Sequence, residues 1–179
     1  SDVREMANIA YDTAKNGFSF LREELWLPPL ETSSEFENPC VLSSYMRLVR
    51  SKEFSALLHS ATGISNLELT RFSVQRYRRG HFLAFSARPP VDAQIGICLC
   101  LTNNWAADWG GVHQFRDIFG SIELGITPAF NALTIYSLSK PNAVSFVGPF
   151  TQESCLVMKA QFSNIVALKL KKGRLSDHF

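Results

Sequence analysis

Few residues of this chain have a type and spacing that could hold a metal ion or act as a nucleophile. Cys98 and Cys100 stand two residues apart in an apolar run, and this spacing on a strand places both side chains on one face. With His113 and Asp108 they could form a metal site, but buried cysteines mostly act as small apolar side chains, and we favour that role. Ser86 has no His and Asp relay and no nucleophile-elbow glycine pattern around it, so serine catalysis is not indicated.

Basic residues are concentrated in two places. Strand alternation sends Arg76 and Arg78 to one face and Tyr77 and Arg79 to the other, and we interpret this run as a solvated edge. The second place is the basic tail over 169–174, which we interpret as a solvated extension, with contact to an acidic partner as the alternative.

The composition restricts the class of protein. The 179 residues fit one domain with a sizeable core, and the net charge of +2 gives no reason to expect nucleic acid as a partner. The four cysteines show neither a disulfide framework nor a zinc pattern, which favours a reduced, cytoplasmic protein. No apolar run approaches the ~20 residues of a membrane span, and no basic-then-apolar leader opens the chain, so no membrane association is expected.

Helical periodicity dominates the first third of the chain. Apolar residues at three- and four-residue steps predict helices over 2–24, 41–49 and 52–59, with a Pro-rich loop over 26–39. Ser51 is placed to cap the last of these helices and Gly63 to end it. Three helices are therefore expected before the first strand.

After Gly63 the pattern changes to the alternation of strands, most clearly from Leu67 to Tyr77. Further strands are predicted over 81–85, 94–101, 111–115, 121–124, 132–137, 143–147 and 155–162. Short turns at Asn, Gly and Pro residues separate them, which suits a jelly roll. The prediction is an α+β fold with the helices packed on one face of a β-sandwich. A single domain over 1–162, with helices within 2–62 and a β core over 65–162, would precede an extension over 163–179.

Several short motifs occur in the order and spacing of one known family. They are Tyr77-x-x-Gly80-His81-Phe82-Leu83, Trp105 with Asp108-Trp109-Gly110-Gly111, Phe130-Asn131-Ala132-Leu133, and Pro141 with Val144-Ser145-Phe146-Val147. With these motifs the chain resembles the prolyl-4-hydroxylase-like branch of the 2-oxoglutarate/Fe(II)-dependent dioxygenase superfamily over roughly residues 4 to 162. The resemblance implies a double-stranded β-helix of the cupin type, in which His81 and the Trp-Gly-Gly loop are structural.

Active members of that family hold Fe(II) with two His and one carboxylate, and clamp 2-oxoglutarate with an Arg. Matched position by position, the first His falls on Ser86, the carboxylate on Arg88, the distal His on Asn142, and the clamp on or beside Ser154. The resemblance therefore implies that the metal ligands and the 2-oxoglutarate clamp are lost. Arg88 would also repel a metal by roughly 4 kcal/mol per unit of charge at about 4 Å. We therefore expect no bound metal and no cofactor.

These expectations describe a catalytically inactive pseudoenzyme that acts by binding. One hypothesis is an interaction, scaffold or regulatory subunit that pairs with itself as a homo-oligomer or with an active relative. A second is that the vacated pocket binds a small carboxylate or phosphate through Tyr77, Arg88 and Asn142. A third is a hydroxylase with unorthodox iron ligands.

Overall fold

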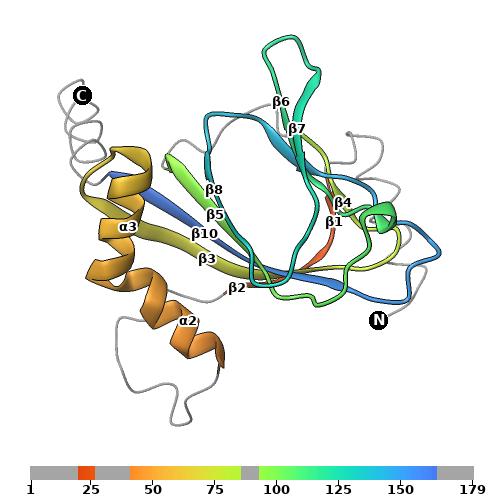
Figure 1. The fold of residues 1–179 in the computed structure, drawn as a ribbon, viewed down its shortest axis with the longest axis horizontal. Coiled ribbons are helices and arrows are strands. Elements are labelled where there is room, and N and C mark those ends of the chain that lie inside the picture. Colours follow the sequence, from red (N-terminus) through yellow and green to blue (C-terminus); the bar gives the residue numbers. More distant parts are fainter. Residues whose placement is uncertain (1–19, 27–40, 86–92, 165–179) are drawn as a thin grey trace, which may run out of the picture.

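Two antiparallel sheets of five strands face each other in the structure, a computed structural model that describes residues 20–26, 41–85 and 93–164 (Figure 1). The strands are β1 (Phe20–Leu21), β2 (Glu23–Trp26), β3 (Leu67–Tyr77), β4 (Phe82–Leu83), β5 (Ile95–Cys100), β6 (His113–Arg116), β7 (Ile122–Ile126), β8 (Leu133–Ser137), β9 (Asn142–Val144) and β10 (Cys155–Asn164). The strand orders are β2-β3-β10-β5-β8 in what we call the β3 sheet and β1-β4-β9-β6-β7 in the β6 sheet. The predicted jelly-roll sandwich is confirmed.

Two helices, α2 (Val41–Arg50) and α3 (Lys52–Thr62), precede β3 as predicted. The Ser51 hydroxyl accepts a hydrogen bond from the backbone N–H of Phe54 at 3.1 Å, which satisfies one of the free donors at the start of α3. Gly63 adopts a φ of 71° and donates its N–H to the carbonyl of His59, a left-handed cap that side chains with a Cβ disfavour. Both predicted end signals of α3 are therefore confirmed.

The helices cover the outer face of the β3 sheet (Figure 1). Met46 and Val49 of α2 and Leu58 of α3 are buried against it, and the rings of Phe54 and Phe162 lie 6.1 Å apart. A second cluster of buried residues, among them Tyr77, Val147 and Val157, lies between the two sheets. The β3 sheet is therefore buried on both faces, and one of these faces lines the inside of the sandwich.

The end of the first predicted helix is wrong. Phe20 and Leu21 pair with β4, and Glu23 to Trp26 pair with β3, so residues 20–24 extend the two sheets instead of ending a helix. The apolar spacing of this short stretch fits a helix and a strand equally, and pairing with distant strands decides between them. The rest of that helix and the loop over 27–39 lie outside the described residues.

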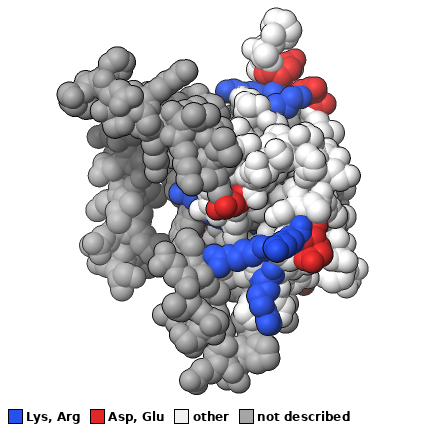
Figure 2. Space-filling view, turned by 90° about the vertical axis from the view of Figure 1, so that its left-hand side faces the viewer, with Lys and Arg blue, Asp and Glu red and all other residues white. Residues whose placement is uncertain are grey.

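Charged side chains of both signs lie on the face of the molecule that carries α2 and α3 (Figure 2). Arg47 and Arg50 stand in the last turn of α2, where positive charge interacts favourably with the helix dipole, and Glu53 stands in the first turn of α3.

The described helices include none that is long and apolar enough to cross a membrane.

Candidate functional site

A cavity of about 40 Å³ lies between the two sheets. Alternate residues of neighbouring strands point into it, because side chains on a strand alternate between the two faces. From the β3 sheet these are Tyr77, Cys98, Cys100, Thr134, Cys155, Val157 and Lys159, and from the β6 sheet His113, Ile126 and Val144. The prediction that Cys98 and Cys100 share a face is confirmed.

Lys159 is the one lysine that the described chain places in this cavity. It lies on β10, directly opposite Ser73 of β3 and Cys98 of β5. The residue as a whole is half-buried, and its ammonium group is buried. Within the described chain the group has no ion pair and no hydrogen bond. The described part of the chain therefore holds a cation inside the sandwich and supplies no ion-pair partner for it.

Burial lowers the pKa of Lys159 below that of an ordinary lysine, because the charged form loses hydration. Arg22 adds repulsion in the same direction, while Cys98, Glu24 and Cys155 act against it. Glu24 is the one carboxylate among these groups, and it already accepts two hydrogen bonds from Arg22. The cavity thus leaves the charge of Lys159 uncompensated.

His113 faces the cavity from the opposite sheet. Its Nε2 lies 3.2 Å from Oδ1 of Asn142 on the neighbouring strand β9, so Nε2–H donates to the amide oxygen. Its ring also contacts Phe115 and Tyr136, with centroids 4.5 and 4.9 Å away. Burial, with repulsion from Lys159, lowers the pKa of His113 to about 3 against the opposing Asn142 bond. The imidazole is therefore neutral, and its buried Nδ1 has no hydrogen-bond partner in the described chain.

The cluster of rings around His113 depends on one glycine. Gly96 pairs with Tyr136 across β5 and β8, and a Cβ on Gly96 would lie 2.5 Å from the Tyr136 ring. The ring therefore lies flat over the glycine and reaches His113 and Phe115. A larger residue at position 96 would displace Tyr136 from this cluster.

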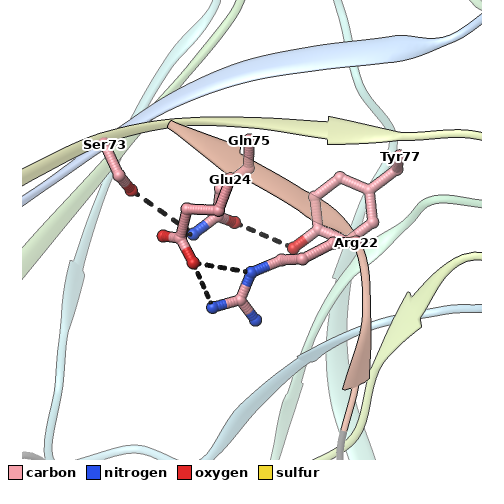
Figure 3. A network of polar contacts seen from close by, with 5 residues as sticks. All are labelled: Arg22, Glu24, Ser73, Gln75 and Tyr77. Atoms are coloured by element: carbon pink, nitrogen blue, oxygen red, sulfur yellow. Dashed lines mark hydrogen bonds and ion pairs between the residues drawn. The ribbon is translucent and has the colours of Figure 1, made fainter. Parts of the chain in front are cut away.

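Tyr77 ends a chain of polar contacts that starts on β2 (Figure 3). Its hydroxyl donates to Oε1 of Gln75 at 2.9 Å, and Nε2 of Gln75 donates to Oε1 of Glu24 at 2.7 Å. Arg22 closes the chain with a bond of 2.7 Å from Nη2 to Oε2 of Glu24. Tyr77 points inward as the resemblance implies, but its hydroxyl proton is directed to Gln75 and so is not offered to a ligand in this arrangement.

The same contacts fix the charge of this network. Burial alone would raise the pKa of Glu24, but the hydrogen bonds from Arg22, Gln75 and Ser73 outweigh it and lower the pKa. Burial raises the pKa of Tyr77 well above its ordinary value. At neutral pH the network therefore holds a carboxylate paired with a guanidinium and a neutral phenol.

Three free thiols line the cavity beside Lys159. A hydrogen bond from Cys155 lowers the pKa of Cys100 and, for the same reason, raises that of Cys155, so Cys100 is the first of the two to ionise. Burial raises the pKa of Cys98. The core role predicted for these cysteines fits their burial, and Asp108, which could have joined them at a metal, lies exposed in the 3₁₀ turn over Ala107–Trp109.

The predicted site residues are only partly brought together. Ser86 and Arg88 lie outside the described residues, so their predicted roles stay predictions. Asn142 is half-buried and bonded to His113, and Ser154 is half-buried, with its carbonyl accepting from the Thr102 hydroxyl at 3.2 Å. Neither lines the cavity beside Lys159.

Lys159 is not among the site residues predicted from the sequence, because the resemblance implies an arginine as the clamp near the last core strand. The signal was present in the run Cys155 to Phe162, where a lysine follows Cys155 and Val157 on the inward face of the strand. A charged residue at an inward position of a buried strand is rare enough to mark a site.

The described residues do not fit the iron site that the resemblance implies. The position of the distal His holds an amide whose oxygen is taken by His113. No three His, Cys, Asp or Glu side chains within the described ranges are grouped so that they could share a metal ion. We therefore derive no step through iron.

No family model and no curated protein matches the sequence of this chain. Solved structures do match its fold. A prolyl-4-hydroxylase from Pseudomonas putida has a TM-score of 0.61 at 15% identity, over 90% of this chain and 85% of that one. A 2OG-Fe(II) oxygenase family oxidoreductase from Burkholderia pseudomallei has a TM-score of 0.61 at 12% identity, over 91% and 80%. The fold is that of the 2-oxoglutarate oxygenases.

A third similar structure is a prolyl hydroxylase from Trichoplax adhaerens in complex with a hypoxia-inducible-factor peptide, with a TM-score of 0.59 at 15% identity, over 93% and 80%. At these identities the likeness establishes the double-stranded β-helix and nothing about chemistry. The function of this oxygenase-fold domain has to be argued from its own cavity.

Proposed function

We propose that this oxygenase-fold domain binds a small carboxylate in the cavity between its sheets and does so without iron. The observation that carries the proposal is the ammonium group of Lys159, buried in the cavity without a counter-charge. Leaving a buried charge unpaired is costly, and a bound anion removes that cost. The amide at the position of the distal His supports the absence of iron chemistry.

The size and charge of the cavity favour a small monovalent anion. A water molecule needs ~10–15 Å³ of such space, so about 40 Å³ holds only a few non-hydrogen atoms. The described part of the cavity contributes one cation, which a single carboxylate balances, whereas phosphate carries up to about two negative charges. The Thr134 hydroxyl lines the same space and offers a second donor.

The expected affinity is modest. A hydrogen bond to a charged group contributes about 1.5–3 kcal/mol, so one anchor with limited apolar contact gives binding in the micromolar to millimolar range. Binding should also return a proton to Lys159, because the carboxylate restores the charged form that burial disfavours. Affinity should therefore weaken as the pH rises.

Thermal unfolding with formate, acetate and phosphate tests the proposal. We expect acetate or formate to raise the Tm of the wild type and to leave that of Lys159→Met unchanged. Lys140→Met is the matched control, because Lys140 is exposed and paired with Glu123. Arg88→Ala tests the predicted role of Arg88 as an anion ligand. An Ala variant that acetate stabilises as much as the wild type would exclude that role. A carboxylate that stabilises Lys159→Met as much as the wild type would refute the role of Lys159.

An interaction subunit is the second candidate, favoured by the β6–β7 hairpin. Its tip presents Ile118 and Phe119, which are 94% and 87% exposed, and it projects from the rest of the molecule (Figure 1). Asp117 fixes the turn, because its Oδ1 accepts from the N–H groups of Phe119 and Ser121. Among the described strands β7 is the outermost of its sheet, so one of its edges has no described partner strand and could pair with a second copy.

A further inference from the structure

Lys159 differs from the other two lysines that the described chain contains. Lys52 and Lys140 are exposed, and Lys140 is paired with Glu123 at 2.6 Å. Lys159 lies inside the sandwich with no ion pair or hydrogen bond in the described part of the chain. An amine in such a place is a nucleophile toward carbonyl carbon, because desolvation favours its neutral form.

We propose that Lys159 forms a reversible imine with a small carbonyl compound that also carries a carboxylate, such as an oxo acid of about two or three carbons. This inference rests on the proposed function, since it names the carboxylate that the cavity takes. The cavity of about 40 Å³ sets the size limit, and no described carboxylate side chain lines it beside the amine.

The step balances without an oxidant or a reductant. The neutral Nζ of Lys159 attacks the carbonyl carbon to give a carbinolamine. The carbon–oxygen bond then breaks, the two amine hydrogens leave with the oxygen as one water, and a carbon–nitrogen double bond remains. Protonation of the imine from water gives an iminium ion.

The carboxylate of the same ligand explains why the adduct is stable in the cavity. The iminium ion has the same unpaired charge as the ammonium, and the neighbouring acid Glu24 is already bonded to Arg22 and Gln75. A carboxylate one or two atoms from the new bond supplies the missing negative charge. A carbonyl compound without an acid group leaves that charge unbalanced, so its imine is disfavoured.

Reductive trapping tests the proposal. The wild type is incubated at pH 7.5 with glyoxylate and cyanoborohydride, and peptide mass mapping follows the carboxymethyl adduct on each lysine. We expect Lys159 to be modified faster than Lys52 and Lys140 in the same sample, by roughly tenfold for each unit by which the pKa of Lys159 lies below that of a surface lysine. An equal or slower rate at Lys159 overturns the proposal.

Variants keep the result independent of folding defects. Lys159→Arg keeps the positive charge but cannot form the trapped adduct, and Lys140→Met removes a surface amine. We expect the fast phase of labelling to vanish in Lys159→Arg and to persist in Lys140→Met. A fast phase that survives in Lys159→Arg assigns it to another amine and refutes the inference.

Two further probes separate this inference from the proposed function. Acetate has the carboxylate without the carbonyl, and acetaldehyde has the carbonyl without the carboxylate. If acetate stabilises the wild type through Lys159 while glyoxylate is not trapped there, the imine is wrong and carboxylate binding stands. If acetaldehyde is trapped at Lys159 as fast as glyoxylate and acetate has no effect, carboxylate recognition is wrong.

Discussion

Nε2 of His113 lies 3.2 Å from Oδ1 of Asn142, across the pairing of β6 and β9. The resemblance implies a metal-binding imidazole where Asn142 stands, and the amide there is bonded to a histidine of the adjacent strand. A neutral amide oxygen that already accepts a hydrogen bond is a weak ligand for iron, which in this fold is held by two imidazoles and a carboxylate. The His113–Asn142 pair therefore links the two strands and leaves the position without a metal ligand.

Purified protein is expected to contain far less than one iron per chain, and a chelator is expected to leave its Tm unchanged. The reason is that Asn142 is committed to His113 and that Ser86 and Arg88 are predicted at the other ligand positions. Elemental analysis and thermal unfolding with and without chelator check this. Iron near one per chain, or succinate formation from 2-oxoglutarate, would favour the hydroxylase hypothesis instead.

Acid should destabilise the protein through His113. Its pKa is about 3 in the folded protein against 6.5 for an ordinary histidine, so between these values the unfolded chain binds a proton that the folded chain does not. This proton uptake by the unfolded chain lowers the free energy of unfolding by ~1.4 kcal/mol per pH unit as the pH falls below about 6.5. Denaturant unfolding at several pH values should show a shallower acid loss for His113→Gln. His59→Gln, at an exposed helix end, should behave as the wild type does.

Removing the buried cation should stabilise the empty protein. Lys159→Met is expected to raise the free energy of unfolding by roughly 1–3 kcal/mol at pH 7, because a buried polar group without a partner usually costs about that much. The folded pKa of Lys159 is lowered, so the unfolded chain binds more protons and wild-type stability rises with pH toward the ordinary lysine value. The gain should therefore shrink by pH 10. A gain that does not depend on pH would show that packing, not charge, is responsible.

Gly110 and Gly120 offer a matched test of the tight loop before β6. Both have positive φ angles, 78° and 90°, so alanine at either position is strained by about 1–2 kcal/mol. A Cβ on Gly110 would also overlap the carbonyl oxygen of Phe146, whereas Gly120 has open space around it. Chemical denaturation should show a larger loss for Gly110→Ala, by roughly 1–3 kcal/mol. Equal losses would mean that the loop relaxes around the methyl group.

Self-association is expected to depend on the hairpin tip. Phe119→Ser should shift sedimentation equilibrium toward the monomer, because burying a phenylalanine contributes roughly 1.5–3 kcal/mol. Phe130→Ser is the control, since Phe130 is also exposed but lies outside the β6–β7 hairpin. A wild type that stays monomeric at high concentration would exclude a second copy as the partner of this surface.

Most of the strands could be predicted because their alternation is local and survives in the fold. Leu67 to Tyr77 is a strand with the predicted bounds, and Ser51 and Gly63 act as predicted at the ends of α3. Phe20 to Trp26 could not be assigned in this way, because its conformation depends on β3 and β4, which lie about 50 to 60 residues further along the chain.

The site was harder to predict than the fold because its contacts join distant residues. His113 and Asn142 are 29 positions apart, and nothing in the sequence around either residue indicates that their side chains are in contact. Lys159 is visible in the sequence as a charge in a strand. Its environment depends on Glu24, which lies on β2, a strand that the sequence did not reveal, and which is bonded to Arg22. The resemblance indicated the positions where the metal ligands of the family would stand, and gave no indication of the cation inside the sandwich.

If the proposed carboxylate binds beside Lys159, it would tie the lifetime of the protein to the concentration of that ligand. Any molecule that binds only the folded state adds RT ln(1 + [L]/Kd) to stability, about 2.7 kcal/mol at a hundred times Kd. Cellular proteases degrade chains from the unfolded fraction, and a change of ~1–2 kcal/mol alters abundance several-fold. A cavity that is costly to leave empty would therefore make the amount of this protein follow the concentration of the small acid that fills it.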